Sequence, residues 1–394
     1  MAVERRRILY VQPNSEVGGS DVALLRLVKA LDPDRYSPVV VLPAEGPLAP
    51  MLRNAGAEVY RLPMIQLRTL PSPVYQSRYL AHFLPTVRRL AALIVEKRAE
   101  LVHTNTLYCL YGGFAAQLAR CPHLWHVREI PPAIPVARPA LGRMALALSR
   151  MVVCSSQACA DTLFGPRARD HRIRVLAEAL DLTEWSRATI SRSIRQELGI
   201  APGVPVVGFV GRLDPWKGLD VFLDAASRVT AHFPNAVFLV SGDAPAGFET
   251  YRDAMVARAA ALGLGDRIRF LGWRYRLGDI PALFTDLDLF CHTSIAPEPF
   301  GLVIIEAMAM GCPVIAARAG GPMEIVQHGV SGLLTPPGDA TALAAAMRDL
   351  LADPDRRARL AAAGRARVEE VYSRPAFAAR LRALSEEALA GTSA

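Results

Sequence analysis

Two series of short apolar segments, rich in β-branched residues, run through the chain and constrain its fold more than any other feature. They alternate with longer stretches of helical periodicity. The first series predicts strands at 7–12, 38–43, 101–105, 124–129 and 150–156, and the second at 204–211, 236–242, 267–272, 287–294 and 313–318. Strands that are apolar along nearly their whole length and separated by helices are typical of parallel sheets covered on both faces. The sequence therefore predicts an α/β fold with two doubly wound domains.

The domain boundaries follow from the gap between the two series. We expect a first domain over 1–180, a linker over 181–203, a second domain over 204–375, and a C-terminal helix over 376–394 that packs back on the first domain. The linker is assigned because it is polar and ends in Pro and Gly residues. The proline-rich stretches 63–85 and 131–139 are expected to be irregular loops, which often carry binding sites.

Composition excludes several classes of protein. With 52% apolar residues in 394 the chain is not disordered, and its six cysteines are scattered without zinc-ligand spacing. We therefore expect buried thiols in a reducing compartment. No apolar run reaches the length of a membrane span, and the one after Arg7 is too short for a signal peptide. We expect a cytoplasmic protein, with peripheral attachment to the inner face of the plasma membrane as an open alternative.

Positive charge is concentrated in the first half of the chain. Residues 1–180 hold 23 Lys and Arg against 13 Asp and Glu, whereas the remainder holds 22 against 24. Such a basic domain attracts nucleic acid, anionic lipid or a phosphorylated substrate. No basic motif interleaved with aromatic residues is present, so nucleic acid is not an expected partner. An anionic membrane surface stays open, as does an ordinary solvated basic face.

The segment APEPFGLVIIEAMAMG (296–311) is the most informative. Glu298 lies in a Pro-flanked loop, and a helix is predicted from about Phe300. The free amides of Phe300 and Gly301 would then form an anion site at its N-terminus. Glu306 falls within an otherwise apolar helix, where a carboxylate without a partner is costly. A bound partner such as a pair of ribose hydroxyls is therefore expected for Glu306.

A second motif, VVGFVGRLDPWKGLD (206–220), is a strand followed by Arg212 and Lys217. Ligands bind at the carboxyl ends of strands in open α/β sheets, so the two cations suggest a clamp for a diphosphate. The alternative is a pair of surface cations at a helix start. It is disfavoured because a first-turn lysine opposes the helix dipole unless an anion binds there. Lysine is also scarce, since Lys29 and Lys97 are the only others.

Two further features are weaker. Gly18 and Gly19 follow the first strand and permit close backbone approach, although a simple strand-to-helix turn explains them nearly as well. His126 ends a strand before the second proline-rich stretch, and His103 is similarly placed, with Asn105 following. The structural alternative remains open for both histidines. No GxGxxG, P-loop, HExxH or GxSxG motif is present, which disfavours nicotinamide, ATPase, metalloprotease and serine hydrolase chemistry.

Together these motifs resemble the retaining GT-B glycosyltransferases of family 4 over essentially the whole chain, most specifically at EPFGLVIIE, with GRLDPWKG and GGPME in support. The resemblance implies two facing Rossmann-like domains and a nucleotide-sugar donor, UDP- or GDP-linked, with no other cofactor. It assigns Glu306 to the donor ribose, Glu298 to the transferred sugar, and Arg212 and Lys217 to the diphosphate. The remaining positions that it assigns to the site are Gly18, Gly19, His126, Phe300, Gly301 and Gly321.

The resemblance implies a retaining hexosyltransferase that needs no metal and acts on a saccharide or lipid-linked acceptor in cell-surface or extracellular polysaccharide synthesis. The departing phosphate would take the acceptor proton. In many relatives the turn before the linker contains Asn-Gly followed by an Asp. This chain departs from that pattern and reads RVLAEALDL (174–182), where Asp181 is the candidate for the acidic residue. A nucleotide-sugar epimerase or hydrolase of the same fold, and a non-catalytic partner subunit, remain alternatives.

Overall fold

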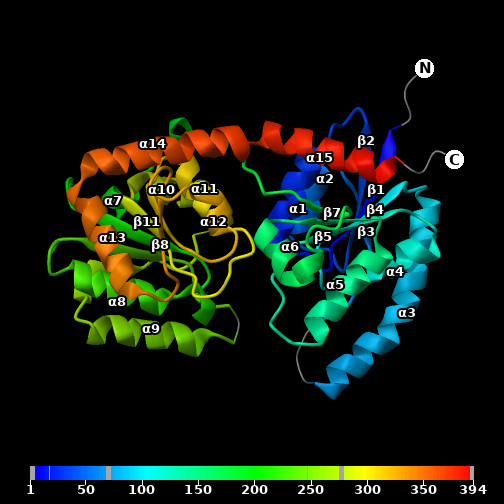
Figure 1. Ribbon diagram of the computed structural model, residues 1–394, viewed down its shortest axis with the longest axis horizontal. Helices are drawn as coiled ribbons and strands as arrows, with labels where there is room; N and C mark the ends of the chain where they lie inside the picture. The colour runs from blue at the N-terminus through cyan, green and yellow to red at the C-terminus, as the bar shows by residue number, and fades with distance from the viewer. Residues whose placement is uncertain (1–4, 17, 68–71, 246, 275–278, 391–394) are drawn as a thin grey trace. The chain divides into compact units, whose positions relative to one another are not determined.

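The computed structural model describes residues 5–16, 18–67, 72–245, 247–274 and 279–390, and divides into two compact units. Unit 1 comprises Met1–Glu178 together with Arg374–Ala394, and unit 2 comprises Ala179–Ser373. Each unit is built on its own parallel sheet (Figure 1). Among the described residues, no helix is both long and apolar enough to cross a membrane.

The sheet of unit 1 has the strand order β3-β2-β1-β4-β5-β6-β7, and every pair is parallel. The strands are β1 (Arg6–Val11), β2 (Tyr36–Leu42), β3 (Glu58–Arg61), β4 (Leu101–Thr104), β5 (His123–Val127), β6 (Met151–Cys154) and β7 (Ile173–Val175). Five of them match the predicted segments. The two edge strands, β3 and β7, were not predicted, because they are short and only partly apolar.

Helices cover both faces of this sheet (Figure 1). Those of unit 1 are α1 (Gly19–Ala30), α2 (Leu48–Asn54), α3 (Pro73–Glu96), α4 (Tyr111–Leu118), α5 (Ala137–Leu148), α6 (Gln157–Phe164) and α15 (Arg374–Leu389), with a 3-10 turn, η1 (Gly165–Arg167). Helix α1 contacts α2 and α15 on one face. On the other face α3 packs against α4, α4 against α5, and α5 against α6.

Helix α3 corrects the expectation of an irregular loop over 63–85. Ser72 caps the helix by accepting a hydrogen bond from the Tyr75 amide, and Pro73 occupies the first turn, where its missing N–H costs nothing. Pro85 lies inside the helix. An internal proline is costly, so burial of the apolar face around Val87 and Leu90 must outweigh it. Helix α5 likewise begins within the second proline-rich stretch.

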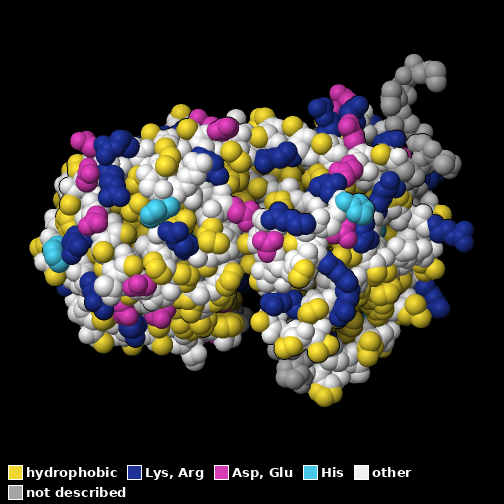
Figure 2. Space-filling model, viewed as in Figure 1, with side chains coloured by type: hydrophobic (Ala, Val, Ile, Leu, Met, Phe, Trp, Pro, Cys, Tyr) yellow, Lys and Arg dark blue, Asp and Glu magenta, His cyan; other side chains and the backbone are white. Residues whose placement is uncertain are grey.

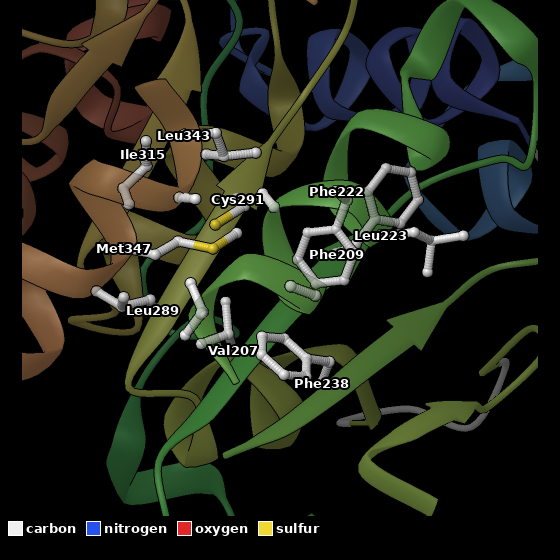
Figure 3. Close-up of a cluster of buried hydrophobic side chains, with 14 of the residues drawn as sticks. Val207, Phe209, Phe222, Leu223, Phe238, Leu289, Cys291, Ile315, Leu343 and Met347 are labelled. Atoms are coloured by element: carbon white, nitrogen blue, oxygen red, sulfur yellow. The ribbon is translucent and has the colours of Figure 1, made fainter. Parts of the chain in front are cut away.

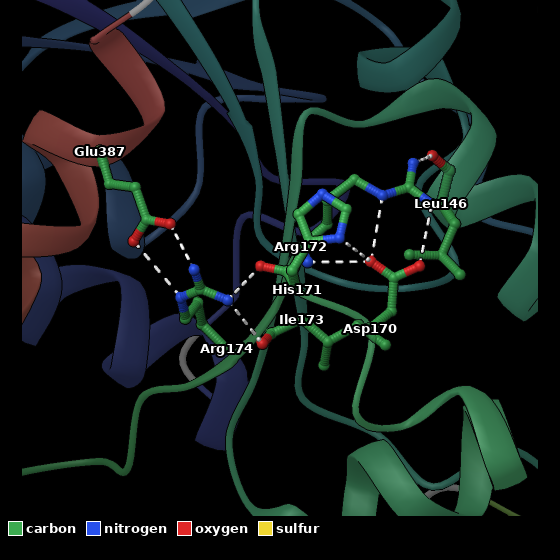
Figure 4. A network of polar contacts seen from close by, with 7 residues as sticks. All are labelled: Leu146, Asp170, His171, Arg172, Ile173, Arg174 and Glu387. Carbon is green, nitrogen blue, oxygen red and sulfur yellow. Dashed lines mark hydrogen bonds and ion pairs between the residues drawn. The ribbon is translucent and has the colours of Figure 1, made fainter.

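Helix α15 returns to unit 1, as the predicted C-terminal helix requires, although it begins at Arg374 rather than 376. It buries Phe377 and Leu381 and packs against α1. Figure 4 shows a second attachment, in which Arg174 of β7 donates to both carboxylate oxygens of Glu387. Helix α15 is therefore part of the unit 1 fold.

The sheet of unit 2 has the order β10-β9-β8-β11-β12-β13, again with all pairs parallel. Its strands are β8 (Val206–Val210), β9 (Val237–Ser241), β10 (Ile268–Phe270), β11 (Leu289–His292), β12 (Val314–Ala317) and β13 (Leu333–Thr335). The five predicted segments of the second series form β8 to β12, and the short edge strand β13 was not predicted.

A large apolar core fills unit 2 between β8, β9, β11 and the helices α8 and α13, with Phe209, Phe222 and Phe238 among its side chains (Figure 3). The helices are α7 (Ile194–Glu197), α8 (Leu219–Val229), α9 (Glu249–Ala261), α10 (Asp279–Asp286), α11 (Leu302–Ala309), α12 (Pro322–Ile325), α13 (Ala340–Ala352) and α14 (Pro354–Val371), with 3-10 turns η2 (Arg187–Thr189), η3 (Pro215–Lys217) and η4 (Gly265–Arg267).

The segment 181–203, expected to be a linker, belongs to unit 2. Arg195, on α7, pairs with Asp288 at 2.6 Å and donates to the carbonyl oxygens of Asp286 and Val204. These contacts anchor the segment at the amino ends of β8 and β11. Asp181 accepts hydrogen bonds from the backbone and hydroxyl of Thr183, which stabilises the turn that begins this segment.

All six cysteines are described, and none forms a disulfide. Five are buried, and Cys121 is half-buried. The expectation of buried thiols therefore matches the structure at five of the six positions.

Candidate functional site

In each sheet the order of the strands reverses direction between two neighbouring strands. Open α/β sheets bind ligands at this point, beyond the carboxyl ends of the strands. In unit 2 this point lies between β8 and β11, and in unit 1 between β1 and β4. The predicted residues Arg212, Lys217 and Glu298 follow β8 and β11. Gly18 follows β1, and His126 lies near the end of β5.

The turn after β8 places Lys217 beside the segment that follows β11. Gly218 has a left-handed conformation with φ of 67°, and a Cβ there would overlap the carbonyl oxygen of Thr293. The Thr293 hydroxyl donates to the Lys217 carbonyl oxygen at 2.9 Å. These contacts bring the Lys217 Nζ atom to 2.6 Å from Glu298 Oε2, although the two residues are 81 positions apart. Lys217 also lies over the Trp216 ring, 4.0 Å from its centroid.

Glu298 is held by three side chains. Besides Lys217, its Oε2 atom contacts His292 Nε2 at 3.2 Å and accepts from the Ser294 hydroxyl at 3.1 Å. Burial by itself would raise the pKa of Glu298, but the Lys217 ammonium and the hydrogen bonds from His292 and Lys217 outweigh it and hold the pKa well below its usual range. Glu298 is therefore a carboxylate at every physiological pH.

Arg212 lies on the same loop and contacts a different carboxylate. Its Nη2 atom is 2.8 Å from Asp214 Oδ2, and the arginine side chain is 53% exposed whereas that of Asp214 is buried. The structure thus brings both predicted cations to the loop after β8, each beside its own carboxylate. An anion that binds there must compete with these carboxylates or share the cations with them.

Two glycines hold the Glu298 loop against the segment after β12. The Gly321 amide donates to the Glu298 carbonyl oxygen at 2.8 Å, and the Glu298 amide donates to Ala319. A Cβ on Gly320 or Gly321 would overlap the backbone of Glu298 or Phe300, respectively. Because these glycines have no side chains, the two segments can pack closely. The main role of Gly321 is therefore to hold the Glu298 loop in position.

Helix α11 begins at Leu302, two residues later than predicted, because Gly301 is its N-cap and has a left-handed conformation with φ of 107°. The Phe300 side chain is buried, with its ring centroid 5.8 Å from that of Tyr372, so only its backbone is available to a ligand. Glu306 lies on the apolar helix α11, as predicted, and its side chain is half-buried there.

In unit 1 the loop after β1 is organised by Asp21. This buried carboxylate accepts hydrogen bonds from the Gly18 amide at 2.9 Å, from Asn14 at 3.1 Å and from Gln12. Neither Gly18 nor Gly19 has a positive φ. A Cβ on Gly19 would meet nothing within 4 Å, so the backbone there is open to close approach from outside.

A buried polar network links β1, β4 and β5 at their carboxyl ends. Asn105 donates to Gln12 at 2.9 Å and accepts from Arg128 Nε at 2.8 Å. Arg128 also forms a buried ion pair with Glu178 and donates from Nη2 to His126 Nδ1 at 3.3 Å. The network therefore surrounds the predicted residue His126.

The proton of His126 can be assigned from its partners. Arg128 can only donate, so Nδ1 of His126 must accept, and the ring proton lies on Nε2. His103 Nε2, 3.2 Å away, then donates to the same Nδ1 atom. Burial, together with the charge of Arg128, lowers the pKa of both histidines well below the usual value, so both are neutral at pH 7. The His126 Nε2 atom is buried, without a hydrogen-bond partner in the described part of the chain.

Sequence reasoning missed several residues of these sites. They are His292 and Ser294, which hold Glu298, and Asp21, Arg128 and Glu178, which organise unit 1. A strand end followed by polar residues, as in FCHTS and WHVRE, is the signal that could have found some of them. Among residues placed by the structure, no group of three or more His, Cys, Asp or Glu side chains is arranged to hold a metal ion.

The sequence of this chain is similar to those of known protein families. Residues 191–367 match the family described as glycosyl transferases group 1, and residues 18–178 match the glycosyl transferase 4-like domain. The 2-deoxystreptamine N-acetyl-D-glucosaminyltransferase of Streptomyces fradiae is 31% identical over 367 residues, covering 86% of this chain and 84% of the relative. This chain therefore belongs to the group 1 glycosyltransferases, and its two parallel-sheet units have the architecture of the GT-B enzymes.

Two other similarities are informative. A crystal structure of Anabaena HepE in complex with UDP and glucose is 30% identical with a TM-score of 0.80, covering 97% of this chain and 100% of that one. The D-inositol 3-phosphate glycosyltransferase of Nocardia farcinica is 38% identical over 193 residues, which is 48% of this chain. The matched region spans only 42% of that relative's length.

Proposed function

We propose that this chain transfers a hexosyl group, with retention of configuration and without a metal ion, from a UDP- or GDP-sugar to a saccharide or lipid-linked acceptor. The product would be a cell-surface or extracellular polysaccharide or glycoconjugate, made in the cytoplasm. The observation that carries the proposal is the contact of Lys217 with Glu298, supported by His292, at the chain reversal of the unit 2 sheet. The similarity to HepE, for which complexes with UDP and with UDP-glucose are known, supports the donor class.

The charge of the leaving group would account for the two cationic side chains after β8. When the anomeric C–O bond breaks, negative charge develops on the departing diphosphate, and preorganised positive groups lower the barrier. Arg212 and Lys217 would supply that charge, with the amides at the start of α11, near Phe300 and Gly301. Glu306 on the same helix would bind the ribose hydroxyls. Two cationic side chains can take the electrostatic role of a metal ion.

Glu298 would bind the transferred sugar. A carboxylate that stays ionised accepts hydrogen bonds from sugar hydroxyls without becoming an acid itself, and its low pKa suits that role. Because Lys217 contacts the same carboxylate, the lysine would connect the sugar subsite with the diphosphate subsite. Gly321 would contribute by holding the Glu298 loop in place.

In unit 1, His126 would act as a neutral hydrogen-bond donor. Its buried Nε2–H matches a sugar hydroxyl or a carbonyl oxygen, and its lowered pKa argues against service as a cationic acid. Gly18 and Gly19 would allow the donor to approach the backbone after β1. In the retaining reaction the acceptor oxygen attacks from the face that the diphosphate leaves, and the departing phosphate oxygen takes the acceptor proton.

The proposal is tested by incubating the protein with UDP-, GDP- and dTDP-sugars and measuring release of nucleoside diphosphate with and without saccharide or lipid-linked acceptors. Lys217→Ala should abolish acceptor-dependent release, whereas Arg228→Ala removes an exposed cation from the neighbouring helix α8 and should not. Release that never depends on an acceptor would favour a hydrolase. Equal rates for Lys217→Ala and wild type would contradict the donor-site assignment.

A further inference from the structure

The helices α3, α4 and α5 form one layer of unit 1 with an uneven charge. They contain five arginines and a single acidic residue, Glu96, which is the last residue of α3. The longer stretch 59–160, in which these helices lie, has twelve Lys and Arg against three Glu. The arginines of the layer are Arg78, Arg88, Arg89, Arg138 and Arg143.

The same layer exposes most of the large apolar side chains of unit 1. Among the residues that the structure describes, unit 1 has ten exposed large hydrophobic residues, and eight belong to α3, α4 or the segment that leads into α5. Those eight are Val74, Leu80, Leu84, Val95, Phe114, Leu118, Ile134 and Val136. Single exposed apolar residues are ordinary, but a concentration of them on one layer marks an interaction surface.

The arginines of the layer also differ from two arginines on the opposite face of the sheet, Arg35 and Arg53. Within the described residues, none of the five forms an ion pair. On the other face, Arg53 pairs with Glu45, and Arg35 pairs with Glu386 of α15. In the part of unit 1 that the structure describes, these five positive charges are therefore not held in ion pairs with carboxylates.

We propose that the α3–α5 layer is a docking surface for an anionic lipid membrane. Hydrophobic and Lys/Arg side chains gather over these helices in Figure 2. On α3, Leu80, Leu84 and Arg88 follow at intervals of four residues, so they lie along one side of the helix, with Leu80 70% exposed. Aliphatic side chains beside arginines are typical of helices that lie in the lipid interface, where the chains enter the acyl boundary and the cations contact head groups.

A nucleic acid fits this surface less well, because its phosphate backbone attracts cations but does not bury aliphatic side chains. Membrane docking also bears on the acceptor. If the proposed transferase function holds, a docked unit 1 favours a lipid-linked acceptor over a soluble saccharide. The docking itself involves neither donor nor acceptor, so it can be measured separately from transfer.

The test is co-sedimentation of the full chain with phosphatidylcholine vesicles and with vesicles that also contain phosphatidylglycerol, at low and moderate salt. The wild type should bind the anionic vesicles and lose binding as salt screens the charges. Arg88→Ala/Arg89→Ala should weaken the partition coefficient roughly fivefold per arginine. The matched control, Arg35→Ala/Arg53→Ala, removes the same charge from the opposite face and should bind like the wild type.

Leu80→Ser/Leu84→Ser should also weaken binding to anionic vesicles, at unchanged net charge. Circular dichroism and thermal melting establish that each variant is folded. The proposal is overturned if the wild type binds neither kind of vesicle at low salt, or if the control loses as much binding as Arg88→Ala/Arg89→Ala. It is also overturned, in favour of nucleic acid, if duplex DNA binds in an Arg88- and Arg89-dependent manner while Leu80→Ser/Leu84→Ser leaves vesicle binding unchanged.

Discussion

Three buried histidines on neighbouring strands should make unit 1 sensitive to mild acid. His103 lies on β4, and His123 and His126 lie on β5. Burial lowers the pKa of all three, and for His123 it lowers the pKa to about 3. Burial keeps His123 neutral, and its partners place the single ring proton, because Nδ1 donates to the carbonyl oxygen of Leu148 and Nε2 lies 2.8 Å from the Thr104 hydroxyl.

The size of the effect follows from proton linkage. Below the unfolded-state pKa of about 6.5 the unfolded chain binds a proton at His123 that the folded chain cannot bind, so stability falls as pH falls. The loss is about 1.4 kcal/mol per pH unit, which gives roughly 2 kcal/mol at pH 5 for His123 alone. The other two histidines shift in the same direction and add to this loss, which for His123 alone is already a sizeable part of a typical domain stability of about 5–15 kcal/mol.

Glu298 gives unit 2 a different pH dependence. Its pKa is lowered, so its contribution to stability persists until the pH falls below the ordinary carboxyl value of about 4.3. A measurement at pH 5 therefore separates the two units. At that pH unit 1 should have lost stability through its histidines, while the Glu298 contribution to unit 2 is still intact.

The assay is urea unfolding at pH 7.5, 6 and 5, followed by fluorescence. Trp125 is buried and is the only tryptophan of unit 1, whereas Trp185, Trp216 and Trp273 belong to unit 2. A chain in which the latter three are replaced by Phe reports unit 1 alone. We expect its urea midpoint to fall steadily between pH 6.5 and 5.

The control isolates one histidine. His123→Gln can still hydrogen-bond the hydroxyl of Thr104, but it removes one titrating group, so the slope of stability against pH should decrease by the equivalent of one proton. His82→Gln, which alters an exposed histidine of α3, is the control for the substitution itself. A unit 1 midpoint that is constant from pH 7.5 to 5, or an unchanged slope in His123→Gln, would refute the reasoning.

Three further outcomes can be checked. Glu298→Gln should lower the transfer rate by about a hundredfold or more, measured as nucleoside diphosphate release, because Lys217 loses its charged partner and the sugar its carboxylate. Transfer should proceed undiminished in excess EDTA, and a loss reversed only by Mg²⁺ or Mn²⁺ would contradict the metal-free mechanism. Gly321→Ala should lower the melting temperature, at a cost of about 1–3 kcal/mol, whereas Gly19→Ala, whose Cβ would meet nothing, should not.

The central strands could be predicted from sequence because their environment is simple. A strand such as β6 is buried along its whole length, so its residues are apolar throughout and the run is easy to recognise. The edge strands β3 and β7 are less buried and contain exposed and charged residues, so they lack the continuous apolar run. Helix α3 was not predicted for another reason. Its prolines indicate a loop locally, and the tertiary burial that stabilises the helix around Pro85 cannot be read from the local sequence.

Some residues of the candidate site could likewise be predicted from sequence, and others could not. Lys217 and Glu298 were identified because each lies in a distinctive local motif, and the structure brings them together. The strand end FCHTS could have indicated that polar residues gather there, but no local pattern indicates that His292 contacts Glu298. Arg128 and Glu178 form their ion pair across 50 positions, which no local pattern can indicate. Residues in the loops were thus predictable, but their supporting partners were not.

The return of α15 to unit 1 means that unit 2 is, in topological terms, an insertion within unit 1. All residues of unit 2 are contiguous, whereas unit 1 lacks one of its covering helices until Arg374–Leu389 has been synthesised. During translation the segment after Glu178 can therefore complete its own core first, although it comes second in the sequence. Unit 1 must wait with the α1 surface that contacts α15 uncovered. Unit 1 can therefore be completed only after the whole of unit 2 has been synthesised.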